Sequence, residues 1–261
     1  MHSSTQYPAL VSCIYAGDAS TVRRLLLTGA LTQKTKMLNT PYGGQTPFMI
    51  AIDMQSNLEQ LHEEGEAGNT RLLQQGVKEI IELLLACPEL DVLRKDPENN
   101  SAITMAINRG DLDLFNKLLQ RPGVNEHASL SWLECAMRSQ TRNTTNILQK
   151  LFTLPIKWTD NDLFSLLKTA VDAYYKFGAT SRKQLEIKLN LLVEQGKRTF
   201  PGINSNPKLI QNWIKQLTQD PPQYSSILLP ILNQLQQEAQ TLQTTAAQAD
   251  SDGVKVLCRV S

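Results

Sequence analysis

The chain has 261 residues, enough for one or two domains with a sizeable core. Lysine and arginine (26) nearly balance aspartate and glutamate (25), so bulk charge does not favour nucleic acid or acidic membranes as partners. No apolar run of about 18 residues is present, and no basic segment followed by an apolar block opens the chain, so we expect no membrane insertion and no Sec-type signal.

The first helical unit lies between residues 8 and 30, after a polar start that we expect to fray. Small and apolar residues precede Gly17, which we interpret as the turn between two short helices. The segment from Asp18 to Ser20 supplies a capping residue for the second helix, which carries the paired leucines Leu25 and Leu26. The segment therefore predicts a short helix, a glycine turn and a leucine-rich helix.

The same order of elements returns twice between Gly43 and Leu119, with a long interruption inside the first of these two copies. One unit of this kind cannot bury its apolar face alone, so we expect the copies to stack side by side into a solenoid. The two copies open at Thr46-Pro47 and Ser101-Ala102, turn at Gly76 and Gly110, and end at Leu84-Leu85 and Leu118-Leu119.

At these residues the chain resembles the ankyrin-repeat family, whose units run roughly T-P-L-H-x-A-A, then G, then V-V-x-x-L-L-x-x-G-A. The resemblance covers roughly residues 5–126, and the spacing of Gly76 and Gly110 is close to the family period of about 33 residues. No copy keeps the family's His, and the third copy has Ser101-Ala102 in place of Thr-Pro. Together with helical patterns further along the chain, the resemblance implies an all-α, ankyrin-like helical-repeat solenoid with C-terminal capping helices. In this fold, residues 31–43 form a hairpin that projects beyond the helices.

Residues 54–75 are an insertion into the second unit. Glutamates make the insertion acidic, and Gly65 and Gly68 break its weak helical pattern. One interpretation is an extended inner helix followed by a solvated loop. The other is a loop that recognises a basic partner. The glutamates are Glu59, Glu63, Glu64 and Glu66.

The second half of the chain continues with helical patterns that echo the repeat less closely. Residues 130–154 and 162–194 predict two further helix pairs, with Thr159 and Ser181 as N-caps of the later pair. After a turn-rich segment, two amphipathic helices either cap the last repeat or bind a partner. We therefore divide the chain into three repeats (1–126), degenerate helical pairs (127–200), capping helices (201–243) and a polar tail that we expect to be disordered (244–261).

No sequence pattern for catalysis, cofactor binding or metal binding is present. The three histidines, His2, His62 and His127, lack a second ligand at zinc spacing, and phosphate-binding loops are absent. Cys13 and Cys135 lie where the repeat places a small helical residue, so we interpret both as buried thiols in a reducing compartment. We therefore expect no cofactor, no metal site and no catalytic residue, and we favour a protein that is not an enzyme.

The favoured function is a protein-interaction scaffold that binds another protein on its concave ankyrin-like surface. Aligning the copies places three short sets of positions outward, and aromatic, Met and Arg side chains there can anchor an interface. We predict that Tyr15→Ala together with Arg109→Ala weakens partner capture and leaves the thermal midpoint nearly unchanged. The outward positions are Ser12, Tyr15, Ala16, Ile50, Asp53, Met54, Met105, Asn108 and Arg109, and the contact candidates are Tyr15, Tyr42, Asp53, Met54, Asn108 and Arg109.

The alternative function is an enzyme or enzyme regulator whose active part is residues 130–261, with the repeats selecting the substrate. Ankyrin-containing effectors that intracellular bacteria deliver into host cells have this plan, and the long insertion and eroded repeats resemble them loosely. We expect a cytoplasmic protein, with translocation into a host cell as the second possible location. The sequence leaves the oligomeric state open.

Overall fold

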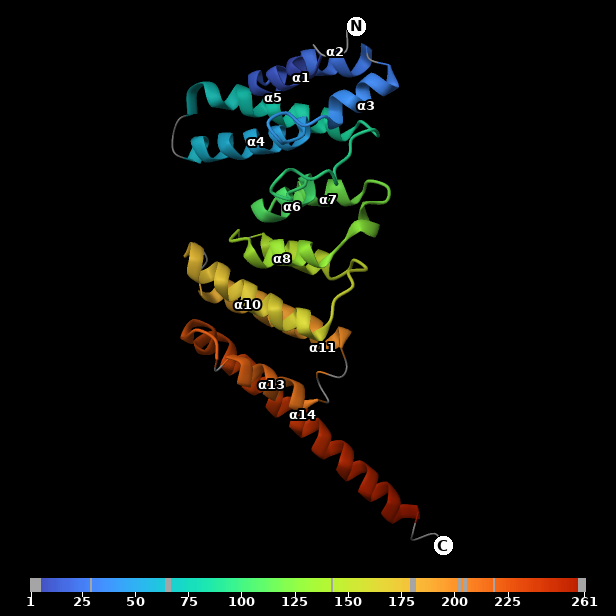
Figure 1. Cartoon of the computed structure of the whole chain (residues 1–261), viewed down its shortest axis with the longest axis vertical. Helices are drawn as coiled ribbons and strands as arrows, with labels where there is room; N and C mark the ends of the chain where they lie inside the picture. The colour runs from blue at the N-terminus through green and yellow to red at the C-terminus, as the bar shows by residue number, and fades with distance from the viewer. Residues whose placement is uncertain are drawn as a thin grey trace. The chain divides into compact units, whose positions relative to one another are not determined.

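The computed structural model describes residues 6–28, 30–63, 67–141, 143–178, 182–200, 203, 206–217 and 219–257. Within these ranges every regular element is a helix, which confirms the predicted all-α class (Figure 1). None of the described helices is both long enough and apolar enough to span a bilayer. The chain divides into two compact units, Met1–His127 and Ala128–Ser261, and each is described by itself below.

Unit 1 consists of helix pairs whose corresponding members pack on one another. The first helices of the pairs, α1, α4 and α6, contact one another in series, and the second helices α2 and α5 are also in contact (Figure 1). Fully buried side chains such as Ile14, Phe48 and Ile103 lie on the first helices. The elements are α1 Gln6–Ala16, α2 Ala19–Thr28, α3 Leu31–Asn39, α4 Pro47–Glu63, α5 Ala67–Leu85, α6 Ala102–Arg109, α7 Leu112–Leu119 and the 3-10 turn η1 Val124–His127.

Local capping explains why α6 and α7 form a tight pair. The Ser101 hydroxyl accepts from the Thr104 backbone N–H and the Thr104 hydroxyl accepts from the Ser101 N–H, which makes a capping box although Ser101 replaces the threonine of the repeat. Gly110 ends α6 in the left-handed region at φ 66°, a conformation that favours glycine. Asp111 then caps α7 by accepting from the Leu114 N–H at 2.9 Å.

Three parts of unit 1 differ from the expectations. Residues 31–39 form helix α3 and not part of the projecting hairpin expected over residues 31–43, because the helix packs on α1 and α4 and buries Met37 and Leu38. The insertion lengthens both α4 and α5, and its three central residues, 64–66, lie outside the described residues. Gly76 is not at a turn but inside α5, where it faces Gly17.

Arg121, just after α7, holds the end of α5 and the loop that follows it. Its guanidinium nitrogens lie 2.8 Å from the Leu85 carbonyl oxygen and 3.0, 3.1 and 2.9 Å from those of Cys87, Pro88 and Leu90. The last carbonyl groups of a helix have no intrahelical donor, and the planar guanidinium supplies several donors at once. Arg121 therefore fixes a connection that contains no regular element.

Unit 2 also stacks helix pairs. Helix α8 contacts α10, α9 contacts α11, and α14 contacts both α10 and α13. Its core includes Leu167 and Val171 of α10, and the Phe164 ring stacks on Trp213 of α13 with 5.5 Å between ring centroids. The elements are α8 Leu130–Arg138, α9 Thr144–Leu151, α10 Asp160–Phe177, α11 Arg182–Thr199, α13 Pro207–Leu217 and α14 Pro222–Leu257.

The ends of the long helices in unit 2 agree only in part with the sequence. Thr159 caps α10 in a capping box with Asp162, as predicted, whereas Ser181 lies outside the described residues. Helix α14 continues to Leu257 through residues that the composition suggested to be disordered. Alanine and glutamine favour helices, and threonines there bond back to carbonyls one turn earlier, as Thr244 does to Gln240 at 2.9 Å.

Candidate functional site

The six predicted contact residues lie on or beside one layer of helices. Tyr15 is on α1, Asp53 and Met54 are on α4, and Asn108 and Arg109 form the end of α6. These three helices contact one another in series. Tyr42 lies in the turn that enters α4. The sequence thus selected residues that the fold gathers on consecutive members of one layer.

Two tyrosines give this layer exposed aromatic surface. The Tyr15 side chain is 55% exposed and Tyr42 is 53% exposed. Tyr42 is held by its backbone, which exchanges hydrogen bonds with Gln45 at 2.7 and 3.2 Å across a turn made by Gly43 and Gly44. Both glycines have positive φ, 59° and 91°, so this turn requires them. Tyr42 is therefore presented from a closed turn.

A polar cluster connects this turn with α4 and α6. The Gln45 amide donates to one carboxylate oxygen of Asp53 at 2.5 Å, and the Arg109 guanidinium donates to the other oxygen. Arg109 also donates to the Ile52 carbonyl oxygen. The Arg109 and Asp53 side chains are only 26% and 33% exposed. Both charges are thus largely satisfied within the chain.

The remaining outward positions divide into exposed and buried ones. Ser12, Ala16 and Asn108 are exposed and Met54 is half-buried. Ile50 and Met105 are buried, so the repeat alignment was wrong about their orientation. Their apolar side chains belong to the core of unit 1, where burial is favourable.

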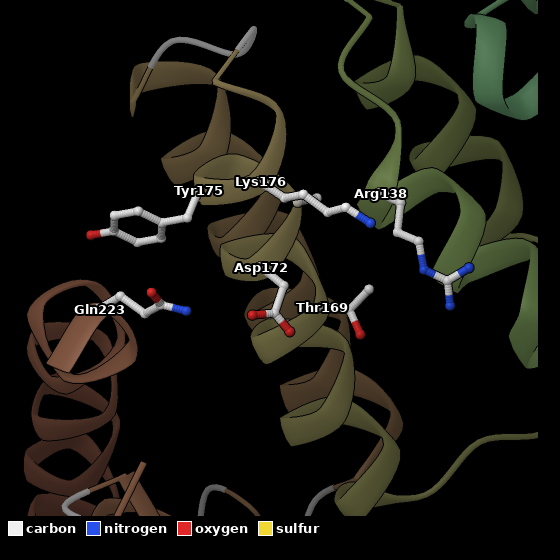
Figure 2. A pocket seen from close by; sticks show the side chains of 7 residues that line it. Arg138, Thr169, Asp172, Tyr175, Lys176 and Gln223 are labelled. Atoms are coloured by element: carbon white, nitrogen blue, oxygen red, sulfur yellow. The ribbon is translucent and has the colours of Figure 1, made fainter. Parts of the chain in front are cut away.

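A second candidate site, which the sequence interpretation missed, is a pocket of about 680 Å³ on unit 2. Figure 2 shows its side chains arriving from three helices: Arg138 from the end of α8, five residues from α10, and Gln223 from the start of α14. No motif marks it, because its residues come from separate segments. The polar residues that line it are Arg138, Thr169, Asp172, Tyr175, Lys176 and Gln223.

Lys188 of α11 is a buried cation near one wall of this pocket. Only 3% of the residue is exposed, and its ammonium group donates to the carbonyl oxygens of Ala136, at 3.3 Å, and Ser139. These carbonyls lie at the end of α8, where the helix dipole favours a positive charge. Burial nevertheless lowers the pKa of Lys188 to about 8. Lys188 thus fixes the end of α8 that carries Arg138.

Burial raises the pKa values of the Cys13 and Cys87 thiols, which keeps them protonated and poorly nucleophilic at neutral pH. Among the described residues, no group of three or more His, Cys, Asp or Glu side chains could hold a metal ion. His2 lies outside the described residues.

Compared with known proteins, the chain matches no protein-family model, no curated protein and no solved structure.

Proposed function

We propose that unit 1 is a protein-interaction module that binds a partner protein on the layer formed by α1, α4 and α6. The observation that supports this most directly is the pair of half-exposed tyrosines on this layer, Tyr15 on α1 and Tyr42 in the turn that Gln45 links to Asp53. In the ankyrin-like arrangement that the sequence resembles, this layer and the turns before it form the concave binding surface.

A surface of this kind binds with a small loss of conformational entropy. The turn that carries Tyr42 is closed by two backbone hydrogen bonds, and Gln45 links the turn to Asp53. Arg109 in turn links Asp53 to α6. Because these groups are held before a partner arrives, less of the interaction energy is lost in ordering them. Tyrosine is also among the side chains that most often dominate binding energy.

The charges of this surface indicate what kind of contact it makes. Asp53 and Arg109 neutralise each other, so the layer has no strong field of one sign at its centre. Recognition then depends on aromatic burial by Tyr15 and Tyr42 and on hydrogen bonds from groups such as Asn108. We therefore expect a modest dependence of binding on salt.

Site-specific photo-crosslinking tests the proposal. A photoreactive amino acid is placed at Ser12 on the proposed surface or at Arg24 on the other layer, where both residues are exposed. A partner identified by mass spectrometry should crosslink from position 12 and not from position 24. Equal crosslinking from both positions would argue against the proposed surface.

A pair of tyrosine substitutions tests the same surface with purified components. Tyr15→Ala with Tyr42→Ala should weaken binding of that partner about tenfold or more, since each removes an exposed aromatic anchor. Leu27→Ala is the matched control, because Leu27 is an exposed apolar residue on α2, outside this layer. An unchanged dissociation constant for the tyrosine variant would refute the role of these residues.

A further inference from the structure

We propose that the pocket on unit 2 binds a small polar molecule that carries a phosphate or carboxylate group. This site is separate from the surface proposed for unit 1, and neither proposal depends on the other. The inference is based on the floor of the pocket, its two cations, the way its walls are held and its size.

One face of α10 forms the floor. Thr169, Asp172, Ala173 and Lys176 follow one another at helical spacing, so they lie on the same side of the helix. Most of the inner positions of α10 are apolar, as expected for a helix that packs on both α8 and α14. A polar face between these two neighbours is left open to solvent and to a ligand.

The pocket contains two cations and one carboxylate. In Figure 2 the Lys176 side chain extends from α10 toward α8, where Arg138 ends the helix. Arg138 pairs with Glu134 one turn earlier at 3.1 Å, but its side chain is 54% exposed. Exposed pairs of this kind contribute little, so the guanidinium can rearrange toward a ligand at small cost. Two donors of this type are suited to an oxyanion.

The carboxylate of the pocket, Asp172, already accepts a hydrogen bond from another residue of the chain. The Tyr224 hydroxyl donates to Asp172, and this contact raises the pKa of Tyr224. Asp172 therefore links α10 to α14 through a hydrogen bond from a neutral donor. Gln223, beside Tyr224, extends toward the same part of the pocket and can offer its amide N–H groups (Figure 2).

Both walls are fixed before a ligand binds. On the α14 side, Lys168 of α10 pairs with Asp220 at 2.9 Å and its ammonium lies 5.1 Å from the centre of the Tyr224 ring. On the α8 side, Lys188 donates to the carbonyl oxygens of Ala136 and Ser139, which flank Arg138 in sequence. A site whose supporting groups are held in place loses less entropy on binding.

Size and composition restrict the ligand. A volume of about 680 Å³ is in the range of sites for small molecules and exceeds the needs of a single inorganic anion. Among the described residues that line the pocket, Ala173 alone has an aliphatic side chain. Tyr175 is exposed, and its hydroxyl lies 3.4 Å from that of Ser226, so its ring can cover a sugar or a planar group. The geometry fits a phosphorylated or carboxylated polar metabolite of sugar or nucleotide size.

Titration of the full chain with three probes tests the proposal. Inorganic phosphate, ribose 5-phosphate and succinate are added at constant ionic strength, and amide chemical shifts of residues 169–176 are followed by NMR. We expect saturable shifts with at least one probe. Binding of ribose 5-phosphate alone would indicate a phosphate source, and binding of succinate alone would indicate a carboxylate source. An absence of saturation with all three probes up to millimolar concentration overturns the proposal.

Charge-neutralising variants test whether the two cations make the site. Arg138→Gln and Lys176→Gln should each lower the association constant about tenfold. Arg182→Gln is the matched control, because Arg182 also pairs with a glutamate one turn away at 3.1 Å but lies outside the pocket. Circular dichroism checks that all variants fold. An equal loss of association constant in the control, or no loss in either pocket variant, would show non-specific ion binding and overturn the proposed anion site.

Discussion

Arg109 at the end of α6 donates to the carboxylate of Asp53 on α4, so two residues predicted to contact a partner also contact each other. The same guanidinium donates to the Ile52 carbonyl oxygen. This relationship makes Arg109 part of the packing between two helix pairs. It also revises the expectation that truncating Arg109 leaves thermal stability unchanged.

Arg109→Ala should lower the free energy of unfolding by about 1–2 kcal/mol, because it removes a partly buried ion pair and a helix-to-helix hydrogen bond. Arg23→Ala is the control. Arg23 pairs with Glu79 between α2 and α5, but that pair is exposed and should contribute less than about 0.5 kcal/mol. Urea unfolding measures the free energy of unfolding of both variants. Equal small losses would mean that the α4–α6 contact does not depend on Arg109.

Gly76→Ala should destabilise unit 1 by about 2–3 kcal/mol, since a Cβ at this position would lie 2.1 Å from the Gly17 carbonyl oxygen. Helix α5 can approach the α1–α2 turn this closely only without a side chain there. Gly196→Ala in α11 is the comparison, because its Cβ would lie 2.5 Å from a terminal methyl group of Leu163, which can shift more easily than a backbone carbonyl, and alanine favours a helix. Calorimetry should show a clear fall in melting temperature for the first variant and a small change for the second. A larger fall in melting temperature for Gly196→Ala than for Gly76→Ala would refute the role of Gly76 in the close contact with Gly17.

Lys188 should make stability depend on alkaline pH. Burial lowers its pKa from 10.5 to about 8, so between these values the unfolded chain binds a proton that the folded chain has released. The folded state therefore gains stability as pH rises through this window. Relative to Lys188→Met, the wild-type chain should gain about 2 kcal/mol between pH 7 and pH 10.

Denaturant unfolding of both proteins at the two pH values measures this gain. Other titrating groups are common to both chains and cancel in the difference. A difference that does not change with pH, or that falls as pH rises, would contradict the assignment of a lowered pKa to Lys188.

The sequence predicted the fold correctly at places where the structure depends on neighbouring residues. Thr159 caps α10 as predicted, and the leucine-rich helices are present because their spacing is helical. Each of these inferences needed only residues within a few turns of one another.

The sequence failed where the outcome depends on distant residues or on an assumed template. The ankyrin pattern predicts a hairpin over residues 31–43, whereas residues 31–39 form α3, which buries Met37 and Leu38. Nothing near Arg109 in sequence indicates its contact with Asp53. The pocket on unit 2 had one available signal, the polar face of Thr169, Asp172 and Lys176 at helical spacing.

Arg121 limits how unit 1 can be shortened. Its guanidinium supplies the donors for the carbonyl groups of Leu85, Cys87, Pro88 and Leu90, more than thirty positions earlier in the chain. A fragment that ended at α6 or α7 would leave the end of α5 without these donors. An autonomous fragment of unit 1 should therefore extend beyond Arg121, and ribosomal synthesis must pass this residue before the α5 connection acquires its native hydrogen bonds.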